Sequence, residues 1–251
     1  MNVLIVGGGI SGMSAAKIIL KEHHNVTILE SAPEPGGLMA RIANCRIGFK
    51  TFFDEIRNDP HLTVISEATI ANVEKEDNVF KVTLDDERRL TADRVIIATG
   101  LSPYDPVEYK GKRVLTSLEY DALIDQRRGE LPEDFKRVAF VLCVGSRSKE
   151  YPLCSSVCCS YTIREIKWTL QRTKPEITVF YNDLRLFGQE FYMEKMYRDA
   201  GVTFIRANSR YFEEDETGVT IRYFTEGGIK EERFNYVVLA IALRPNPQLA
   251  A

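Results

Sequence analysis

The sequence has no apolar run that approaches the roughly 20 residues of a membrane-spanning helix. It also has no excess of positive charge, because 33 Lys and Arg face 36 Asp and Glu and the net charge is −3. These absences argue against direct membrane insertion and against binding to nucleic acid. The N-terminal stretch MNVLIVGGG has no basic region and no cleavage site, so we expect no secretory signal and a cytoplasmic location.

Cysteine is scarce, and its count of five is odd. Thiols stay reduced in the cytoplasm, so this count argues for metal or redox chemistry rather than a disulfide framework. The spacing is uneven, because Cys45 stands alone and the other four form the pattern C-x10-C-x3-C-C, namely Cys143, Cys154, Cys158 and Cys159. Four cysteines so close together exceed what packing needs.

The first thirty residues predict a strand over 2–6, a glycine turn, a helix from about 11 to 22 and a second strand over 26–29. The turn contains G-x-G-x-x-G at Gly7, Gly9 and Gly12, and the second strand ends in Glu30. In such a turn the first glycine permits the bend, the second admits a pyrophosphate, and the third lets the helix pack on the sheet. The acid can bind ribose hydroxyls, so the sequence predicts a dinucleotide site.

Three features favour FAD over NAD as this dinucleotide. The motif starts at the beginning of the chain, EPGGLMAR with Gly36 and Gly37 follows the acid at once, and RVIIATG over 94–100 ends in Thr-Gly. The set resembles the FAD domain of the thioredoxin-reductase-like flavoproteins. The resemblance implies that Ala98, Thr99 and Gly100 lie near the dinucleotide and that the strand around Ile70 passes the adenine. The predicted FAD-binding residues are Gly7, Gly8, Gly9, Ile10, Ser11, Gly12, Glu30, Ser31, Gly36, Gly37, Leu38, Ile70, Ala98, Thr99 and Gly100.

The second half again alternates strands and helices, which predicts a second doubly wound domain. Its first strand leads into CVGSRSKEYPLC, where only Gly145 is left of a second G-x-G-x-x-G, so we doubt a nicotinamide site there. The expected fold class is α/β, with two Rossmann-like dinucleotide-binding domains of the thioredoxin-reductase/glutathione-reductase type. We place the FAD-binding domain at 1–110, the degenerate NAD-type domain with the cysteines at 111–243, and a truncated return toward the FAD domain at 244–251.

Cys143, Cys154, Cys158 and Cys159 are candidate metal ligands, since four thiolates suit either a 4Fe-4S cluster or a structural zinc ion. Structural zinc sites use two separate C-x2–4-C pairs, and this spacing has no second pair. The spacing therefore favours iron–sulfur. Cys45 is expected to be a buried residue or a neighbour of the flavin.

CVGSR, CSSVCCSYTIREIKW and the segment over 180–206 resemble the heterodisulfide reductase family, in particular its A subunit. The chain has no C-x2-C-x2-C-x3-C run, so it resembles short forms without ferredoxin domains. The resemblance implies an FAD-dependent oxidoreductase subunit that transfers electrons between FAD and a 4Fe-4S cluster. It also implies a hetero-oligomer with other iron–sulfur or redox subunits, and it leaves room for a homodimer core.

Two alternatives remain open. One is a non-enzymatic scaffold subunit whose cysteine site holds zinc or is empty. The other is a stand-alone NAD(P)H-dependent flavin reductase, which would need a second glycine turn and a redox cysteine pair that the sequence does not contain.

Overall fold

The computed structural model of the chain describes residues 1–109, 111–126, 131–207 and 210–245. The chain divides into two compact units, one comprising Met1–Leu101 and Pro245, the other Ser102–Arg244. Of the predicted return segment, residues 246–251 lie outside the described ranges. None of the described helices is both long enough and apolar enough to cross a membrane.

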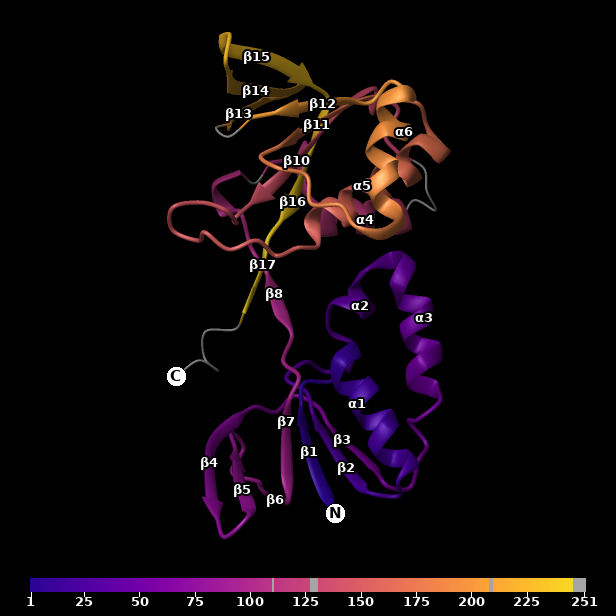
Figure 1. The fold of residues 1–251 in the computed structure, drawn as a ribbon, viewed down its shortest axis with the longest axis vertical. Coiled ribbons are helices and arrows are strands. Elements are labelled where there is room, and N and C mark those ends of the chain that lie inside the picture. Colours follow the sequence, from indigo (N-terminus) through magenta and orange to yellow (C-terminus); the bar gives the residue numbers. More distant parts are fainter. Residues whose placement is uncertain (110, 127–130, 208–209, 246–251) are drawn as a thin grey trace. The chain divides into compact units, whose positions relative to one another are not determined.

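The first unit is built on a four-stranded parallel sheet in the order β3-β2-β1-β7. Its strands are β1 (Asn2–Val6), β2 (Asn25–Leu29), β3 (Leu62–Ile65) and β7 (Arg94–Ile97). Three helices lie on one side of this sheet in Figure 1: α1 (Ile10–Lys21), α2 (Gly37–Arg41) and α3 (Ala43–Asp54). An antiparallel sheet is made of β4 (Ile70–Glu76), β5 (Val79–Leu84) and β6 (Arg89–Ala92). This small antiparallel sheet is inserted in the chain between β3 and β7.

Strand alternation explains why this sheet is covered on both faces. Side chains of successive strand residues point to opposite faces. Accordingly Val3 and Ile5 of β1 pack with α1 and α3 in one apolar cluster. Leu4 and Val6 pack with β5 and β6 in another. A strand that buries both faces is apolar along its buried length, as Val3–Val6 of β1 are.

The second unit has a five-stranded parallel sheet in the order β12-β11-β10-β16-β9. Its strands are β9 (Val114–Thr116), β10 (Arg137–Val144), β11 (Glu176–Tyr181), β12 (Thr203–Arg206) and β16 (Tyr236–Ile241). The helices are α4 (Ser117–Gln126), α5 (Cys158–Arg172) and α6 (Met193–Asp199), with short 3-10 turns η1 (Val107–Tyr109) and η2 (Gly188–Tyr192). An antiparallel sheet, β13 (Arg210–Asp215), β14 (Gly218–Thr225) and β15 (Gly228–Phe234), packs on the parallel one, and β8 (Leu101–Pro103) pairs with β17 (Leu243–Pro245).

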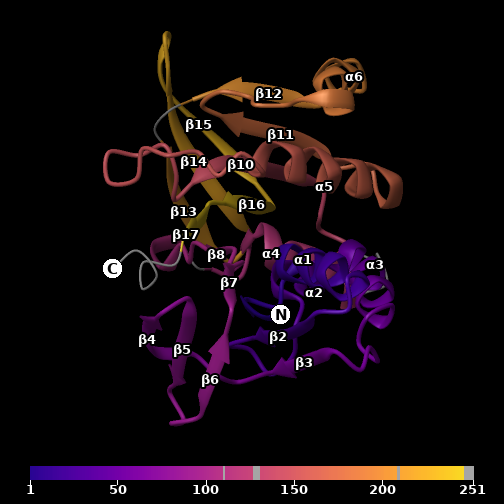
Figure 2. The ribbon, with the colours of Figure 1, turned by 60° about the horizontal axis from the view of Figure 1, so that its bottom comes forward.

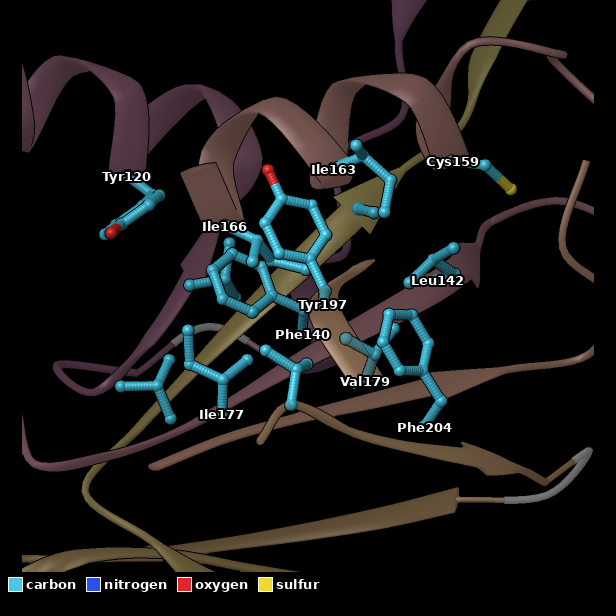
Figure 3. Close-up of a cluster of buried hydrophobic side chains, with 14 of the residues drawn as sticks. Tyr120, Phe140, Leu142, Cys159, Ile163, Ile166, Ile177, Val179, Tyr197 and Phe204 are labelled. Atoms are coloured by element: carbon cyan, nitrogen blue, oxygen red, sulfur yellow. The ribbon is translucent and has the colours of Figure 1, made fainter. Parts of the chain in front are cut away.

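The central strand β10 again separates two apolar clusters. Val138, Phe140 and Leu142 face α4, α5 and α6, whereas Ala139 and Val141 face the antiparallel sheet. Figure 3 shows the first cluster, in which Ile163 and Ile166 of α5 lie over the strands. In Figure 2, α5 runs along the parallel strands, and the antiparallel sheet lies on their other side. This packing fixes both the end of β10 and the start of α5.

Two local conformations differ from what residue type alone suggests. The segment after Phe187 begins as the 3-10 turn η2 and becomes α-helical only at Met193. The acidic run EEDET over 213–217 is strand as far as Asp215, because β13 pairs with β14. Cross-strand pairing, rather than the charge of this run, decides its backbone conformation.

Candidate functional site

The glycine turn after β1 is dictated by contacts of the chain with itself at two positions. Gly7 has φ +108, and a Cβ there would lie 2.4 Å from the carbonyl oxygen of Ala98. A Cβ on Gly12 would lie 2.0 Å from the carbonyl oxygen of Gly7. Helix α1 therefore packs so closely on the turn that only glycine fits at either position.

Gly9 differs from its neighbours because nothing lies within 4 Å of the position a Cβ would take. It stands directly before α1, and the first helical hydrogen bond runs from Met13 N–H to Gly9 O at 3.0 Å. The amides of Ile10, Ser11 and Gly12 belong to the first turn, where backbone N–H groups have no partner within the helix. Open space in front of a helix N-terminus suits an anionic phosphate group.

The second glycine pair lies beside the first. The Gly36 N–H donates a 2.8 Å hydrogen bond to Gly8 O, and a Cβ on Gly37 would meet Gly9 Cα at 3.4 Å. Gly36 has φ +143 and Gly37 has φ +53, which L side chains rarely adopt. Leu38 follows in α2. The two glycine turns predicted from separate stretches are thus in direct contact.

The carboxylate of Glu30 lies at the same edge of the sheet and is 8% exposed. Its Oε2 accepts a hydrogen bond from Gly8 N–H at 2.9 Å. Its Oε1 accepts from Ala32 N–H at 2.9 Å and from the Ser31 hydroxyl at 3.2 Å. A charged group held by backbone donors is fixed in place, which an acceptor for ribose hydroxyls requires.

The remaining predicted FAD-binding residues fall in two places. Ala98 follows β7 and donates from its N–H to Val6 O at 2.8 Å, which brings Thr99 and Gly100 to the carboxyl edge of the sheet. Gly100 has φ +65 with nothing near its Cβ position. Ile70 begins β4 and packs against the apolar cluster below that edge.

In the second unit, Cys143 occupies the irregular end of β10. The register between β10 and β16 shifts between Val141 and Val144, and Cys143 has φ +66. Gly145 follows with φ +77. A positive φ is uncommon for a non-glycine residue and gives the strand end a sharp turn. Cys143 packs at the edge of the same apolar cluster as the other two cysteines discussed next.

Cys158 and Cys159 are the first two residues of α5, and both are buried. Cys158 Sγ lies 2.9 Å from the Ser155 hydroxyl, and Cys159 Sγ accepts from Arg185 N–H at 3.4 Å. Figure 3 shows Cys159 at the N-terminal end of α5 with its sulfur turned away from Ile163. The start of a helix favours a negatively charged ligand, and a thiolate is such a ligand.

Cys154 lies in the segment between β10 and α5, where its Sγ accepts from Ser156 N–H at 3.4 Å. That segment is folded on itself, since Arg147 N–H donates to Leu153 O at 3.1 Å and Ser148 N–H donates to Tyr151 O at 3.0 Å. The amide donors and the Ser155 hydroxyl that touch the sulfurs were not identified from the sequence. No sequence signal marks such contacts, because the backbone path decides which amides face a sulfur.

Cys143, Cys158 and Cys159 belong to one apolar cluster, and charge on Cys154 acts on the pKa of the two buried thiols. Burial raises the pKa of the Cys158 thiol to about 11, and negative charge on Cys143, Cys159 or Cys154 acts in the same direction. Burial also raises the pKa of Cys159, with Cys143 and Cys154 again acting in that direction. Without a positive charge beside them, the buried Cys158 and Cys159 thiols stay protonated. A metal or cluster supplies that positive charge, so the donor set fits one chemically.

Among the described residues, no three His, Cys, Asp or Glu side chains form a group that could hold a metal ion as they stand. The four thiols therefore share a region without a preformed ion site. Cys45 belongs to the first unit, where it is half-buried in α3 (Ala43–Asp54).

A cavity of about 320 Å³ opens in the second unit beside the end of β10. Its lining includes Cys143, Gly145 and Ser146, together with Tyr104 and Asn182. In doubly wound folds, ligands bind beyond the carboxyl ends of the strands. Here that position is lined by the cysteine-bearing segment, and a Cβ on Gly145 would lie 2.1 Å from the Tyr104 ring.

These features define a class: an α/β protein of two units, each with a parallel sheet between helices and an antiparallel sheet, the first with a glycine cradle and a buried acid for a dinucleotide. Residues 1–145 match the family model described as pyridine nucleotide-disulphide oxidoreductase. The chain belongs to the pyridine nucleotide-disulphide oxidoreductase family. The expected fold class and the expected oxidoreductase class are both confirmed.

Relatives of known function narrow the resemblance. The chain is 31% identical over 60% of its length to an iron-sulfur A subunit of the CoB–CoM heterodisulfide reductase of Methanopyrus kandleri, covering 26% of that protein. It is 24% identical over 99% of its length to the corresponding iron-sulfur A subunit of Methanocaldococcus jannaschii, covering 55% of it. The resemblance to the A subunit of heterodisulfide reductase is confirmed, and the chain spans between a quarter and about half of these relatives.

Solved structures agree on the fold. The T. acidophilum thioredoxin reductase superposes with a TM-score of 0.67 at 20% identity, covering 97% of this chain and 77% of that one. A NAD-dependent persulfide reductase from A. fulgidus gives 0.61 at 19% identity, covering 100% and 47%.

Proposed function

We propose that this chain is a redox subunit that binds FAD in its first unit and a 4Fe-4S cluster in its second. The relatives named above support a redox subunit role. Its partners in this proposal are other iron–sulfur or redox subunits, as expected from the relatives' description as subunits. When bound, the flavin supplies two-electron chemistry and the cluster supplies one-electron transfer.

The observation that carries the FAD proposal is the contrast among the glycines. Contacts within the chain require Gly7 and Gly12, whereas no contact within 4 Å requires Gly9. A glycine that faces open space at a helix N-terminus leaves room for an incoming phosphate group. The fixed carboxylate of Glu30 would then accept hydrogen bonds from the ribose, and the Gly36–Gly37 turn would border the rest of the cofactor.

The cluster proposal assigns Cys143, Cys154, Cys158 and Cys159 as ligands. Their spacing, their common neighbourhood and the amide donors at two of the sulfurs support it. Hydrogen bonds to ligand sulfurs are one way in which a protein adjusts the potential of such a cluster. These residues would bind the cluster and limit its contact with water, since Cys158 and Cys159 are buried.

A scaffold role is the second candidate, and one observation favours it. Burial keeps the Cys158 thiol protonated at neutral pH in the metal-free chain by raising its pKa, and a protonated thiol packs as a small apolar side chain. In that case the cysteines would simply complete the apolar cluster under α5.

The test is to purify the chain without oxygen and to assay flavin, iron, sulfide and zinc on one sample. Flavin with about four irons and four sulfides per chain supports the proposal, provided that Cys158→Ser loses the iron and keeps the flavin. Cys45→Ser is the matched control and should keep both. Zinc in place of iron, or no metal and no flavin, would refute the electron-transfer proposal and leave the scaffold.

A further inference from the structure

Arg244 lies far from the cysteines in sequence but contacts the segment between β10 and α5, which follows Cys143 and contains Cys154. It belongs to β17 (Leu243–Pro245), directly after the closing strand β16. Its Nε and Nη2 donate to the carbonyl oxygen of Gly145, at 3.1 Å and 2.6 Å. Gly145 is two residues past Cys143, so this fork holds the turn that sets the direction of the segment.

The same guanidinium contacts two tyrosine rings. Its Cζ lies 4.2 Å from the centre of the Tyr104 ring and 4.7 Å from the centre of the Tyr151 ring. Tyr104 follows β8, whereas Tyr151 lies in the segment between β10 and α5, three residues before Cys154. Arg244 therefore touches the segment at two points, the Gly145 carbonyl and the Tyr151 ring.

The backbone around these contacts is tied to the parallel sheet. Tyr104 N–H donates to Ala242 O, and Ala242 N–H donates to Val144 O, both at 2.8 Å. Tyr151 is anchored on its other side, because its N–H donates to the Ser148 hydroxyl at 3.0 Å and its carbonyl accepts from Ser148 N–H. Arg244 thus fastens a loop without regular secondary structure to a rigid sheet, and the ion pair of Arg147 with Asp183 at 3.5 Å is a second link.

We propose that Arg244 is a positioning residue that clamps the 145–153 segment so that Cys143 and Cys154 are held for cluster binding. This role rests on the proposed cluster. The planar guanidinium group can donate two hydrogen bonds to a carbonyl and contact two aromatic rings at the same time. The ammonium group of a lysine cannot make this set of contacts. Both hydrogen bonds go to a neutral carbonyl, so no carboxylate partner cancels the positive charge of Arg244. This charge stays beside the segment, where thiolates that bind a cluster would be negatively charged.

The test compares Arg244→Gln and Arg244→Lys with Arg198→Gln in the full chain. Arg198 is the matched control, since its Cζ lies 4.6 Å from the Phe204 ring and it pairs with Glu194 on α6. The first measurement is hydrogen exchange of the amides of Arg147, Ser148 and Tyr151. Losing the charged hydrogen bonds and the cation–π contacts should raise the equilibrium constant for local opening of the segment at least tenfold. We therefore expect at least tenfold faster exchange in both Arg244 variants.

The second measurement is the cluster itself: iron and sulfide per chain, and the reduction potential followed by the EPR signal of the reduced protein. Arg244→Gln should hold less than half of the wild-type iron, with a more negative potential in the fraction that is loaded. Arg244→Lys keeps the charge and should lose iron as well, with a smaller change in potential. Arg198→Gln should match the wild type throughout.

Unchanged exchange in both Arg244 variants would overturn the clamp. Faster exchange with wild-type iron content, potential and EPR signal would overturn the positioning role. If the wild-type chain itself binds no iron and sulfide, the proposed function fails and the positioning of a cluster fails with it. Hydrogen exchange of the metal-free wild type and Arg244 variants still shows whether Arg244 holds the segment. It therefore distinguishes a missing cluster from a missing clamp.

Discussion

A buried carboxyl group in the second unit makes the stability of the protein depend on pH. Glu165 lies on α5, is 0% exposed, and neither of its carboxyl oxygens has a hydrogen-bond partner among the described residues. Burial raises its pKa well above 4.5, and the nearby charge of buried Asp121 on α4 raises it further. The carboxyl is therefore neutral in the folded chain at a pH where it would be ionised in water. The perturbation is Glu165→Gln, which keeps the shape and removes the ionisation.

The sign follows from linkage. A group whose pKa is higher in the folded than in the unfolded state stabilises the fold fully below the unfolded pKa. That stabilisation is lost as pH rises toward the folded pKa. Between the two values the unfolded chain holds fewer protons, so each pH unit lowers the free energy of unfolding by about 1.4 kcal/mol. Glu165→Gln should abolish this slope and so gain stability over the wild type with rising pH.

The assay is urea unfolding at about pH 5, 6 and 7, all above the ordinary pKa of a glutamate. The single tryptophan, Trp168, lies three residues after Glu165 in α5 and reports on this unit by fluorescence. Asp121→Asn should narrow the pH range over which the free energy of unfolding falls, because Asp121 raises the pKa of Glu165. As a control, Glu231→Gln at an exposed position of β15 should keep the wild-type dependence of stability on pH. Equal slopes for the wild type and Glu165→Gln would refute the reasoning.

Four further predictions concern the cradle and the core. Gly9→Ala should fold normally but hold at least tenfold less flavin, whereas Gly12→Ala should lose about 1–3 kcal/mol of stability through its clash, as urea unfolding will show. Equal flavin in Gly9→Ala and the wild type would contradict the cradle. Phe140→Ala, fully buried under α5, should cost about 3–5 kcal/mol in the same assay. Tyr120→Phe removes a buried 2.5 Å hydrogen bond to Thr169 and should cost about 1 kcal/mol; a neutral result would mean that the bond adds no net stability.

Much of the first unit could be predicted because its signals are local. The apolar run of β1, the glycine turn and the acid at the end of β2 lie within thirty residues, and each has a backbone or packing reason that does not depend on distant parts. The contact between the two glycine turns also has a local cause, since both follow strands that end at the same edge of the sheet. The assignment of FAD-binding and cluster-binding residues stays a prediction that the assays above address.

The second unit shows where local reasoning stops. The extension of β13 to Asp215 depends on pairing with β14, and no periodicity in EEDET indicates it. Glu165 looks like an ordinary polar residue of an amphipathic helix, yet it is fully buried near Asp121 of α4. Burial of this kind depends on which helices share one face of a sheet, and helical periodicity gives no information on that.

The sequence by itself determined the order of strands and helices, the glycine cradle and the grouping of three cysteines within one short segment, because these follow from spacing and residue type. Only the tertiary structure decided what surrounds them. Strand β16 lies beside β10, and so Arg244, about a hundred residues away in the chain, reaches the carbonyl of Gly145. The physical reason is that sheet order follows from the burial of whole faces, whereas sequence spacing encodes only the periodicity of each element.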